Sequence, residues 1–199
     1  MLGLLDLSIA FDTVNHDILI QRLRISFGFD GVALQWIESF LSGRLQAIAF
    51  RGYTSAYLFV MYGISQGSVL GPLLFVLYTA DVTSIPAVHN VRVHTYADDT
   101  QLYTFFSAAD GATSAVQLLR YIDDINRWMC SNWLKVNADK TQFIWLGAPR
   151  QLQQVSSVQL IVDGVPVLLL ETVRDLGVTL NAQLSFKQHV DSIVRGCFY

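Results

Sequence analysis

The sequence predicts an α+β fold, in which a mostly antiparallel sheet carries helices packed on one face. The predicted elements follow the order strand, helices, strands, helix, hairpin, helix, strands, which is typical of such a layered arrangement. Asp163-Gly164 between two apolar runs is a strong signal for a tight antiparallel hairpin. Hydrophobic residues make up 52% of the 199 residues and charged residues 15%, a composition that buries a core.

In the first half of the chain, the sequence predicts an apolar strand, two helices and two further strands. In order, they cover residues 2–9, 16–27, 32–41, 44–51 and 57–61. Thr13 or Asn15 is placed to cap the first helix, because short polar side chains accept hydrogen bonds from free N–H groups at helix starts. Both helices repeat apolar residues every three to four positions, which gives each a face for the core. A polar turn over residues 52–55 joins the last two strands.

In the second half, a polar loop bracketed by Gly63 and Gly67 precedes further helices and strands. The expected helices cover residues 68–85, 112–133 and 185–199, and the expected strands cover residues 91–97, 101–105, 142–146, 158–162, 165–169 and 174–180. The middle helix carries an apolar stripe with helical spacing. The stripe consists of Leu118, Ile122, Ile125, Met129 and Trp133. The stretch 147–157 is polar and unpatterned, so it is a candidate boundary between domains.

Composition and charge exclude several classes of function. No apolar run reaches the roughly 18 residues that a membrane-spanning helix needs, and the first residues lack the basic flank of a signal peptide. We therefore expect an intracellular protein that is neither secreted nor anchored in a membrane. The net charge of −3 lacks the basic footprint of proteins that grip nucleic acid on their own. Cys130 and Cys197 form no metal-binding pair, and we expect two buried free thiols.

Three acidic residues stand where a carboxylate is costly. Asp6 interrupts an apolar strand, and Asp98 and Asp99 are adjacent between two strands. Burial and mutual repulsion raise the pKa of such carboxyls unless a cation compensates. Mg²⁺ is the simplest candidate, and two such ions would clamp the attacking and leaving oxygens of a phosphoryl transfer. The alternative is that Asp98 and Asp99 are ordinary turn and surface acids. Spacing alone leaves nucleotide cyclases, phosphatases and polymerases open.

Five segments resemble motifs A to E of the reverse transcriptases of non-LTR (LINE-type) retrotransposons. They are, in order, LDLSIAFDTVNHDILIQRL, GISQGSVLGPLLFVLYTADV, YADDTQLY, NWLKVNADKTQFIWLG and VRDLGVTL. Their order and separations match the family over residues 2–198, nearly the whole chain. The resemblance implies the palm of an RNA-directed DNA polymerase. Such a nucleotidyltransferase extends a DNA primer on an RNA template with deoxynucleoside triphosphates.

The resemblance also implies roles for single residues. It makes Asp6, Asp98 and Asp99 the catalytic carboxylates that bind two Mg²⁺ ions, for which Mn²⁺ can substitute, and the backbone carbonyl of Leu7 a further metal ligand. The remaining matched positions are Phe11 under the nucleotide sugar, Gln66 and Gly67 against the incoming nucleotide and the template, Lys140 near the leaving pyrophosphate, and Leu176-Gly177 at the primer end. Without the resemblance, Phe11 is a core residue, Gln66 a turn residue and Lys140 a solvated surface cation.

The same resemblance predicts the domain organisation. Residues 1–182 correspond to the palm with motifs A to E, and residues 183–199 to the start of a truncated thumb or connection helix. Because Met1 lies five residues before Asp6, we expect the fingers to be absent and the thumb nearly absent. Polymerisation would then depend on a longer chain or another protein, and the isolated chain is expected to be inactive. The alternative is a catalytically silent retrotransposon remnant that is inert or serves as a protein-interaction module.

Overall fold

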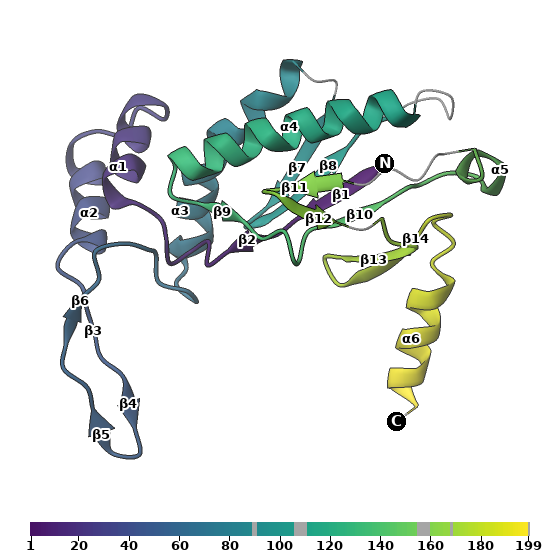
Figure 1. The fold of residues 1–199 in the computed structure, drawn as a ribbon. Helices are drawn as coiled ribbons and strands as arrows, with labels where there is room; N and C mark the ends of the chain where they lie inside the picture. The colour runs from purple at the N-terminus through teal and green to yellow at the C-terminus, as the bar shows by residue number, and fades with distance from the viewer. Residues whose placement is uncertain (89–90, 106–110, 155–159, 168, 199) are drawn as a thin grey trace. The chain divides into compact units, whose positions relative to one another are not determined.

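The computed structural model describes residues 1–88, 91–105, 111–154, 160–167 and 169–198, which form two compact units (Figure 1). The first unit comprises residues 1–8, 83–128 and 136–199. The second unit comprises residues 9–82 and 129–135. Each unit is therefore built from segments that are far apart in the sequence.

The first unit is organised around a four-stranded, fully antiparallel sheet with the strand order β10-β1-β8-β7. These strands are β10 (Gln142–Ile144), β1 (Leu2–Leu5), β8 (Asp99–Tyr103) and β7 (Arg92–Tyr96). In the central strand β1, Gly3 pairs with Phe143 on one side and Leu102 on the other. A Cβ atom at Gly3 would lie 2.6 Å from the ring of Phe143. Glycine therefore leaves room for this fully buried ring beside the strand that leads to Asp6.

Helix α4 (Gly111–Ser131) runs along this sheet in Figure 1 and largely confirms the predicted apolar stripe. Its members Leu118, Ile122, Ile125 and Met129 are each at most 2% exposed. The prediction is wrong for Trp133, which is 58% exposed. The helix ends at Ser131, and Trp133 adopts a φ of 59°, so the chain has already left the helical path that would place this ring in the core.

Two hairpins and two helices complete the first unit. They are β11 (Leu160–Val162) with β12 (Val165–Val167), β13 (Thr172–Asp175) with β14 (Val178–Asn181), α5 (Pro149–Leu152), and α6 (Lys187–Cys197), which contacts β14. The β11–β12 hairpin is the one predicted at Asp163-Gly164. The prediction of a single strand over residues 174–180 is wrong. Leu176 and Gly177 have φ angles of 43° and 86°, so the chain folds back there and forms the two strands β13 and β14. Bulky residues rarely take a positive φ, so Leu-Gly is a weak turn signal.

The second unit is mainly helical, with α1 (His16–Ile25) packed against α2 (Gly31–Leu41) and α3 (Leu70–Thr79). Asn15 caps α1 as predicted, since its side-chain oxygen accepts a hydrogen bond from the N–H of Ile18 at 3.0 Å. The α-helix predicted over residues 68–85 is shorter than expected. It changes at Ala80 into a 3-10 helix, η1 (Ala80–Val88). Two further short strands were not predicted as separate elements, namely β2 (Leu7–Ser8), which belongs to the first unit, and β9 (Lys135–Val136), where the second unit ends and the first resumes.

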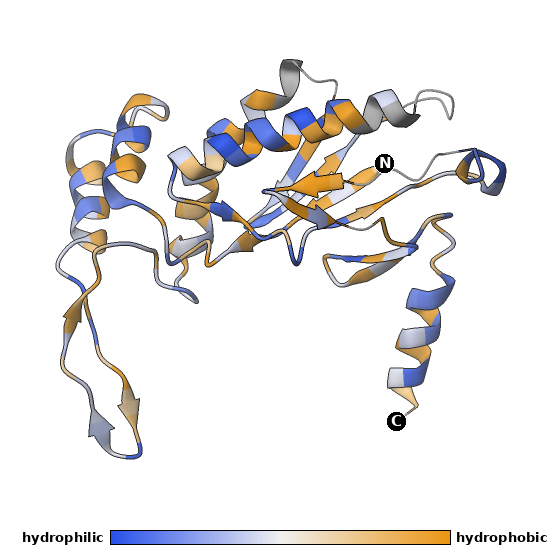
Figure 2. Ribbon diagram, in the orientation of Figure 1, coloured by the Kyte–Doolittle hydropathy of each residue, from blue (hydrophilic) through white to orange (hydrophobic). Residues whose placement is uncertain are grey.

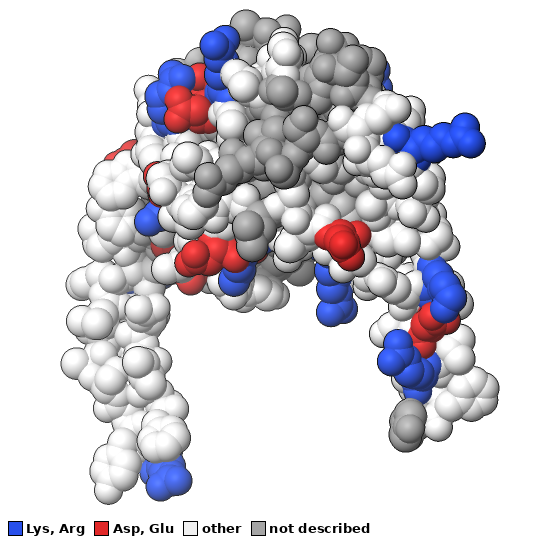
Figure 3. All heavy atoms as spheres, turned by 45° about the vertical axis from the view of Figure 1, so that its right-hand side comes forward, with Lys and Arg blue, Asp and Glu red and all other residues white. Residues whose placement is uncertain are grey.

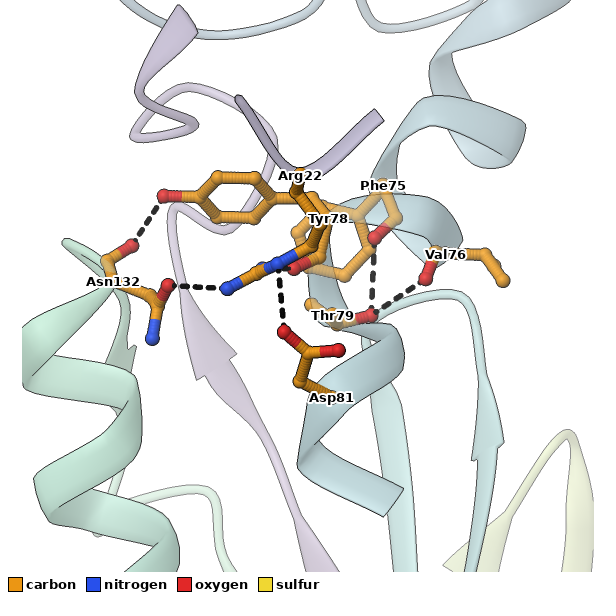
Figure 4. A network of polar contacts seen from close by, with 7 residues as sticks. All are labelled: Arg22, Phe75, Val76, Tyr78, Thr79, Asp81 and Asn132. Carbon is orange, nitrogen blue, oxygen red and sulfur yellow. Dashed lines mark hydrogen bonds and ion pairs between the residues drawn. The ribbon is translucent and has the colours of Figure 1, made fainter. Parts of the chain in front are cut away.

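A polar network joins the helices of the second unit (Figure 4). The guanidinium of Arg22 donates to the backbone carbonyl of Tyr78 and to the side-chain oxygen of Asn132, at 2.9 Å, and it pairs with Asp81 at 3.0 Å. The hydroxyl of Tyr78 donates to the backbone carbonyl of Asn132 at 2.6 Å. Burial raises the pKa of Tyr78, although the N–H of Asn15 and the charge of Arg22 oppose that shift. The network connects α1, the junction of α3 with η1, and the turn that follows α4.

A long hairpin also belongs to the second unit and lies where the two strands over residues 44–51 and 57–61 were predicted, but the predicted turn over residues 52–55 is wrong, because the chain turns at Arg51-Gly52 and residues 53–54 are a strand. Its strands are β3 (Leu45–Gln46), β4 (Ala49–Phe50), β5 (Tyr53–Thr54) and β6 (Leu58–Phe59), with β3 paired to β6 and β4 to β5. Every residue from 48 to 59 is exposed. The hairpin is therefore held by its own backbone pairing and not by burial in this unit.

Two expectations about the surface have different outcomes. Cys130 and Cys197 are free, as expected, but both are exposed, which contradicts the prediction of buried thiols. Cys130 directly follows a member of the apolar stripe of α4, and Cys197 ends a helix that buries none of its side chains.

Within the described ranges, no helix has both the length and the apolar character needed to cross a bilayer.

Candidate active site

Asp6 directly follows the central strand β1 and is the most constrained of the predicted carboxylates. Its side chain is 30% exposed, but its Oδ2 atom is shielded from solvent and accepts no hydrogen bond from any described residue. The ammonium of Lys140 lies 3.7 Å from Oδ2, beyond hydrogen-bonding distance. A shielded carboxylate oxygen without a donor is costly. This position therefore favours binding of a further cation.

A backbone turn places Lys140 beside Asp6. The N–H of Asn137 donates to the backbone carbonyl of Asp6 at 2.8 Å, which fixes the start of the turn. The carbonyl of Asn137 then accepts from the N–H of Lys140 at 3.2 Å and from the hydroxyl of Thr141 at 2.8 Å. Thr141 is buried, whereas the Lys140 side chain is 70% exposed. Lys140 is thus a solvated cation, as predicted from its residue type alone. Its ammonium nevertheless lies beside the carboxylate of Asp6.

Asp98 lies in the tight turn between β7 and β8, and Asp99 is the first residue of β8. Tyr96 pairs with Asp99 across the hairpin, which leaves Ala97 and Asp98 as the two turn residues. Ala97 has a φ of 54°, in a turn position where glycine is the usual residue. A non-glycine residue in that conformation stores about 1 kcal/mol or more of strain. Such strain fits a turn whose shape serves a site.

The sheet register brings these carboxylates close to Asp6. Thr100, next to Asp99, pairs with Leu5, next to Asp6. Burial raises the pKa of the Asp99 carboxyl, and the negative charges of Asp98, Asp6 and Asp175 raise it further. Asp99 therefore lies in one electrostatic cluster with the other two predicted carboxylates, both of which repel it.

Asp175 is a fourth carboxylate of this cluster, and the sequence analysis missed it. It ends β13, directly before the Leu176-Gly177 turn, and its Oδ1 accepts a hydrogen bond from Gln101 of β8 at 2.8 Å. The turn places both Leu176 and Gly177 at the exposed end of the β13–β14 hairpin. The available signal was an acid directly before Leu176-Gly177, which the resemblance places at the primer end, but the segment was interpreted as one continuous strand.

The donor set is suitable for a hard divalent cation, although it is not arranged as a compact ligand cluster. Among the described residues, no group of three or more His, Cys, Asp or Glu side chains is close enough to hold a metal ion. The available donors are carboxylate oxygens, which Mg²⁺ prefers. The shielded Oδ2 of Asp6 and the repulsion that acts on Asp99 both fit a missing positive charge. Leu7, whose carbonyl was predicted to assist, begins β2 with its side chain buried.

Phe11 belongs to the second unit. Its half-buried ring stacks on Phe75 of α3, with the ring centroids 4.8 Å apart. That contact fits the alternative that Phe11 is a core residue, and it also gives the ring a fixed position.

Gln66 and Gly67 occupy an exposed turn before α3 in the second unit. Gly67 has a φ of 78°, a conformation that favours glycine. A cavity of about 950 Å³ lies beside this turn, with Asp12, Arg44 and Gln66 among its lining residues.

Gly63 fixes this turn to the segment that carries Phe11. The N–H of Gly63 donates to the carbonyl of Val14, and the N–H of Ile64 donates to the carbonyl of Phe11, both at 2.8 Å. Gly63 has a φ of 85°, and a Cβ atom there would stand 2.8 Å from the backbone oxygen of Asp12. The close pairing of the two segments therefore requires glycine at this position.

We predict that Gly63→Ala lowers the free energy of unfolding by about 2–4 kcal/mol, because an unfavourable φ adds to a clash with backbone atoms. Gly67→Ala is the matched control. It has a similar φ, but nothing lies within 4 Å of its added Cβ, so a loss of about 1 kcal/mol is expected. Urea unfolding followed by circular dichroism compares the two variants. Equal losses would contradict the close approach of Gly63 to Asp12.

We predict that Asp99→Asn stabilises the chain at neutral pH in buffer containing EDTA. The folded state raises the pKa of this carboxyl above its ordinary value of 3.8. The folded state therefore favours the protonated form, and its stability falls as the pH rises through the raised pKa. The advantage of Asp99→Asn should disappear as the pH falls towards 3.8 and Asp99 becomes protonated. Thermal unfolding at several pH values measures this difference.

Asp163→Asn provides a matched control for Asp99→Asn, because Asp163 lies in an exposed turn of the same unit. We expect the stability of this variant to follow that of the unchanged chain across the same pH range. A pH-independent gain for Asp99→Asn would show that repulsion among the carboxylates is not its cause.

Comparisons with known proteins identify the family to which the chain belongs. The model of the family described as "Reverse transcriptase (RNA-dependent DNA polymerase)" matches residues 1–180. The chain is 31% identical over 195 residues to "RNA-directed DNA polymerase from mobile element jockey" of Drosophila funebris, and 30% identical over 195 residues to its namesake of Drosophila melanogaster. Each match covers 95% of this chain and 20% of the relative. The chain thus spans about a fifth of the length of these relatives.

The fold is similar to that of a solved telomerase. The similarity to telomerase from Candida albicans, in complex with a fragment of telomeric RNA, has a TM-score of 0.61 at 15% identity. It covers 92% of this chain and 30% of the telomerase chain. At this identity the similarity concerns the fold alone, and it agrees with the observed mixture of helices and antiparallel sheets. Since the family model covers nine tenths of the residues, the chain belongs to the reverse transcriptase family, and its relatives are those of non-LTR retrotransposons, as the five motifs predicted.

Proposed function

We propose that residues 1–182 form the palm of an RNA-directed DNA polymerase of a non-LTR retrotransposon, with residues 183–199 beginning the thumb or connection helix. The observation that carries the proposal is the shielded Oδ2 of Asp6, which has no hydrogen-bond donor and belongs to one electrostatic cluster with Asp98 and Asp99. Carboxylates gathered in this way are suited to binding cations, which in turn can hold a triphosphate, and are unsuited to packing.

The reaction would be nucleotidyl transfer, in which the 3′-hydroxyl of a DNA primer attacks a deoxynucleoside triphosphate and pyrophosphate leaves. Asp6, Asp98 and Asp99, together with the carbonyl of Leu7, would hold two divalent cations, with Mg²⁺ favoured and Mn²⁺ as a substitute. When bound, these ions would supply charge neutralisation at the attacking and leaving oxygens. This chain otherwise contributes positioning, which dominates catalysis of phosphoryl transfer.

Lys140 would act on the leaving group. Its ammonium is largely exposed, lies 3.7 Å from the Asp6 carboxylate, and is held on an anchored turn. An ammonium so placed can neutralise developing negative charge on pyrophosphate, or donate a proton to it. The nearby carboxylate keeps the side chain directed towards the reacting centre.

The remaining residues would position the substrates. Phe11, fixed against Phe75, would lie under the nucleotide sugar and exclude a ribose 2′-hydroxyl. Gln66 and Gly67 would contact the incoming nucleotide and the RNA template, because their exposed turn leaves the backbone accessible. Leu176-Gly177, which follows the carboxylate of Asp175, would hold the primer end.

Primer extension tests this proposal. A fluorescent DNA primer annealed to an RNA template is incubated with deoxynucleotides and MgCl₂, and with the chain alone or joined to the flanking regions of the jockey polymerase. We expect template-directed incorporation by the joined form. If neither form incorporates nucleotides, although cooperative unfolding shows that both are folded, the polymerase function is contradicted. The catalytically silent remnant would then be the function that remains. Sugar selection is tested by offering ribonucleotides in place of deoxynucleotides to the joined form and to its Phe11→Ala variant. We expect the variant to incorporate ribonucleotides that the unchanged form rejects.

A further inference from the structure

The hairpin between β3 and β6 is an exposed, aromatic surface that the proposed catalytic roles leave unused. Figure 2 shows apolar stretches on both of its strands. Five aromatic side chains occur between Ser42 and Tyr62, namely Phe50, Tyr53, Tyr57, Phe59 and Tyr62. All five are at least 47% exposed. Exposed aromatic rings on a surface that the core does not use indicate a binding role.

The tip of this hairpin has a defined geometry. Phe50 pairs with Tyr53 across the ladder, and they are 68% and 82% exposed. Arg51 and Gly52 form the two-residue turn, with φ angles of 48° and 82°, as in a type I′ hairpin. The guanidinium carbon of Arg51 lies 5.2 Å from the centroid of the Phe50 ring. The tip therefore presents two neighbouring rings and one cation, without a flexible loop.

The net charge of the hairpin segment itself is positive, whereas that of the whole chain is negative. None of the 16 Asp and Glu residues falls between Ser39 and Ala80, whereas Arg44 and Arg51 lie at the base and the tip of the hairpin. Figure 3 shows this hairpin without acidic groups on the visible face and with a basic group at its tip. In a chain of net charge −3, this is a locally cationic segment, and its charge is complementary to phosphate.

We infer that the tip of this hairpin binds single-stranded nucleic acid, with bases stacked on Phe50 and Tyr53 and a phosphate paired with Arg51. Rings that accept the faces of bases, together with a few cations for the backbone, are the means by which proteins bind single strands without reading sequence. The inference rests on the proposed function for the kind of partner, since a polymerase that copies RNA handles single strands on both sides of its duplex. An apolar groove on another protein is less well matched, because it would need neither the arginine nor the two paired rings at the tip.

Fluorescence anisotropy of 5′-fluorescein-labelled oligonucleotides of about 12 nucleotides, U₁₂ and dT₁₂, tests the inference on the full chain. Nucleotides are omitted and EDTA is present, so the measurement does not depend on catalysis. Tyr53→Ala is expected to weaken binding between about 5-fold and 150-fold, the range for losing one stacking platform. Tyr53→Trp should retain binding. The substituted side chain is 82% exposed, so both variants should fold, which circular dichroism checks.

Two matched controls separate stacking from general apolar contact. Ile48→Ala removes an exposed aliphatic side chain from the same hairpin, and Phe198→Ala removes an exposed ring from the end of α6. Both should keep affinity within about 2-fold, since neither removes a stacking platform at the tip. A loss for Ile48→Ala as large as that for Tyr53→Ala would overturn the inference, as would unchanged binding in Tyr53→Ala. A concentration-dependent dimer by light scattering, abolished by Tyr53→Ala, would assign the tip to a second copy instead.

Salt dependence gives an independent test of the same contacts. Each phosphate contact to a single strand contributes about −0.7 to the slope of log affinity against log salt. With Arg51 as the one cation at the tip, we expect a slope near −0.7, which is lost in Arg51→Gln. A slope steeper than about −3, unchanged by Arg51→Gln, would place the binding elsewhere. If the oligonucleotides bind as expected but no primer is extended, the proposed polymerase function is contradicted and the inference about the hairpin stands. If primers are extended but Tyr53→Ala changes neither extension nor oligonucleotide binding, the inference about the hairpin is contradicted and the polymerase function stands.

Discussion

Asp98→Asn is expected to lower the rate of primer extension by at least about 10³-fold in the form of the chain that extends a primer. Losing one preorganised electrostatic group from an active site costs on the order of 10² to 10³, and Asp98 would also share in holding the cations. Asn keeps the size of the side chain and one of its oxygens, so the variant removes charge and little else. The rate is measured by single-nucleotide incorporation with the primer, RNA template and deoxynucleotide at saturation.

A loss of folding would also remove activity, so the same variant is compared by its stability. Asp98 lies in a turn and is one of the charges that raise the pKa of Asp99. Removing that charge should leave the chain as stable as before, or more stable, in EDTA. Asp163→Asn, in the exposed turn of the β11–β12 hairpin, should keep full activity. Activity of Asp98→Asn within about 10-fold of the unchanged chain would exclude the catalytic role of this carboxylate.

Periodicity and short-range signals predicted much of the fold. The stripe on α4 could be read from the sequence because helical spacing depends only on local geometry, and four of its five members are in the core. Asn15 was found in the same way, since a cap acts within three residues. The prediction that Trp133 lies in the core was wrong because it extended the same spacing beyond the end of the helix. The end of α4 depends on how the chain turns beyond Ser131, and the stripe itself carries no information about it.

The candidate site depends on contacts that local patterns do not encode. Lys140 faces Asp6 because the N–H of Asn137, far along the chain, donates to the carbonyl of Asp6. The family resemblance named Lys140, but no spacing rule places it there. Asp175 was missed because its position depends on a turn at Leu176 with a positive φ, which a leucine rarely adopts. Residues with strained conformations are where reasoning from propensity is expected to fail.

Arg22→Met is expected to lower the free energy of unfolding by about 3–5 kcal/mol, the largest effect on stability that we predict. Met preserves the length and most of the apolar volume of the side chain but removes every donor. The side chain of Arg22 is only 10% exposed, so water cannot replace what it provides to Tyr78 and Asn132. Asp81 contributes less to the loss, because its side chain is 46% exposed and can be solvated. Urea unfolding measured by circular dichroism gives the difference.

Arg24→Met is the matched control, because Arg24 lies on the same helix and also pairs with a carboxylate. Its side chain is 64% exposed, and its distance to Glu38 is 3.7 Å. Exposed pairs of this kind contribute between about 0 and 1 kcal/mol, so little change is expected. Tyr78→Phe should fall between the two variants, at about 1–2 kcal/mol, because it removes one buried hydrogen bond to Asn132 and leaves the guanidinium in place. If Arg22→Met and Arg24→Met lowered the free energy of unfolding equally little, the network would not be what holds α1 to the end of α3. The packing of apolar side chains between these helices would then be sufficient to hold them together.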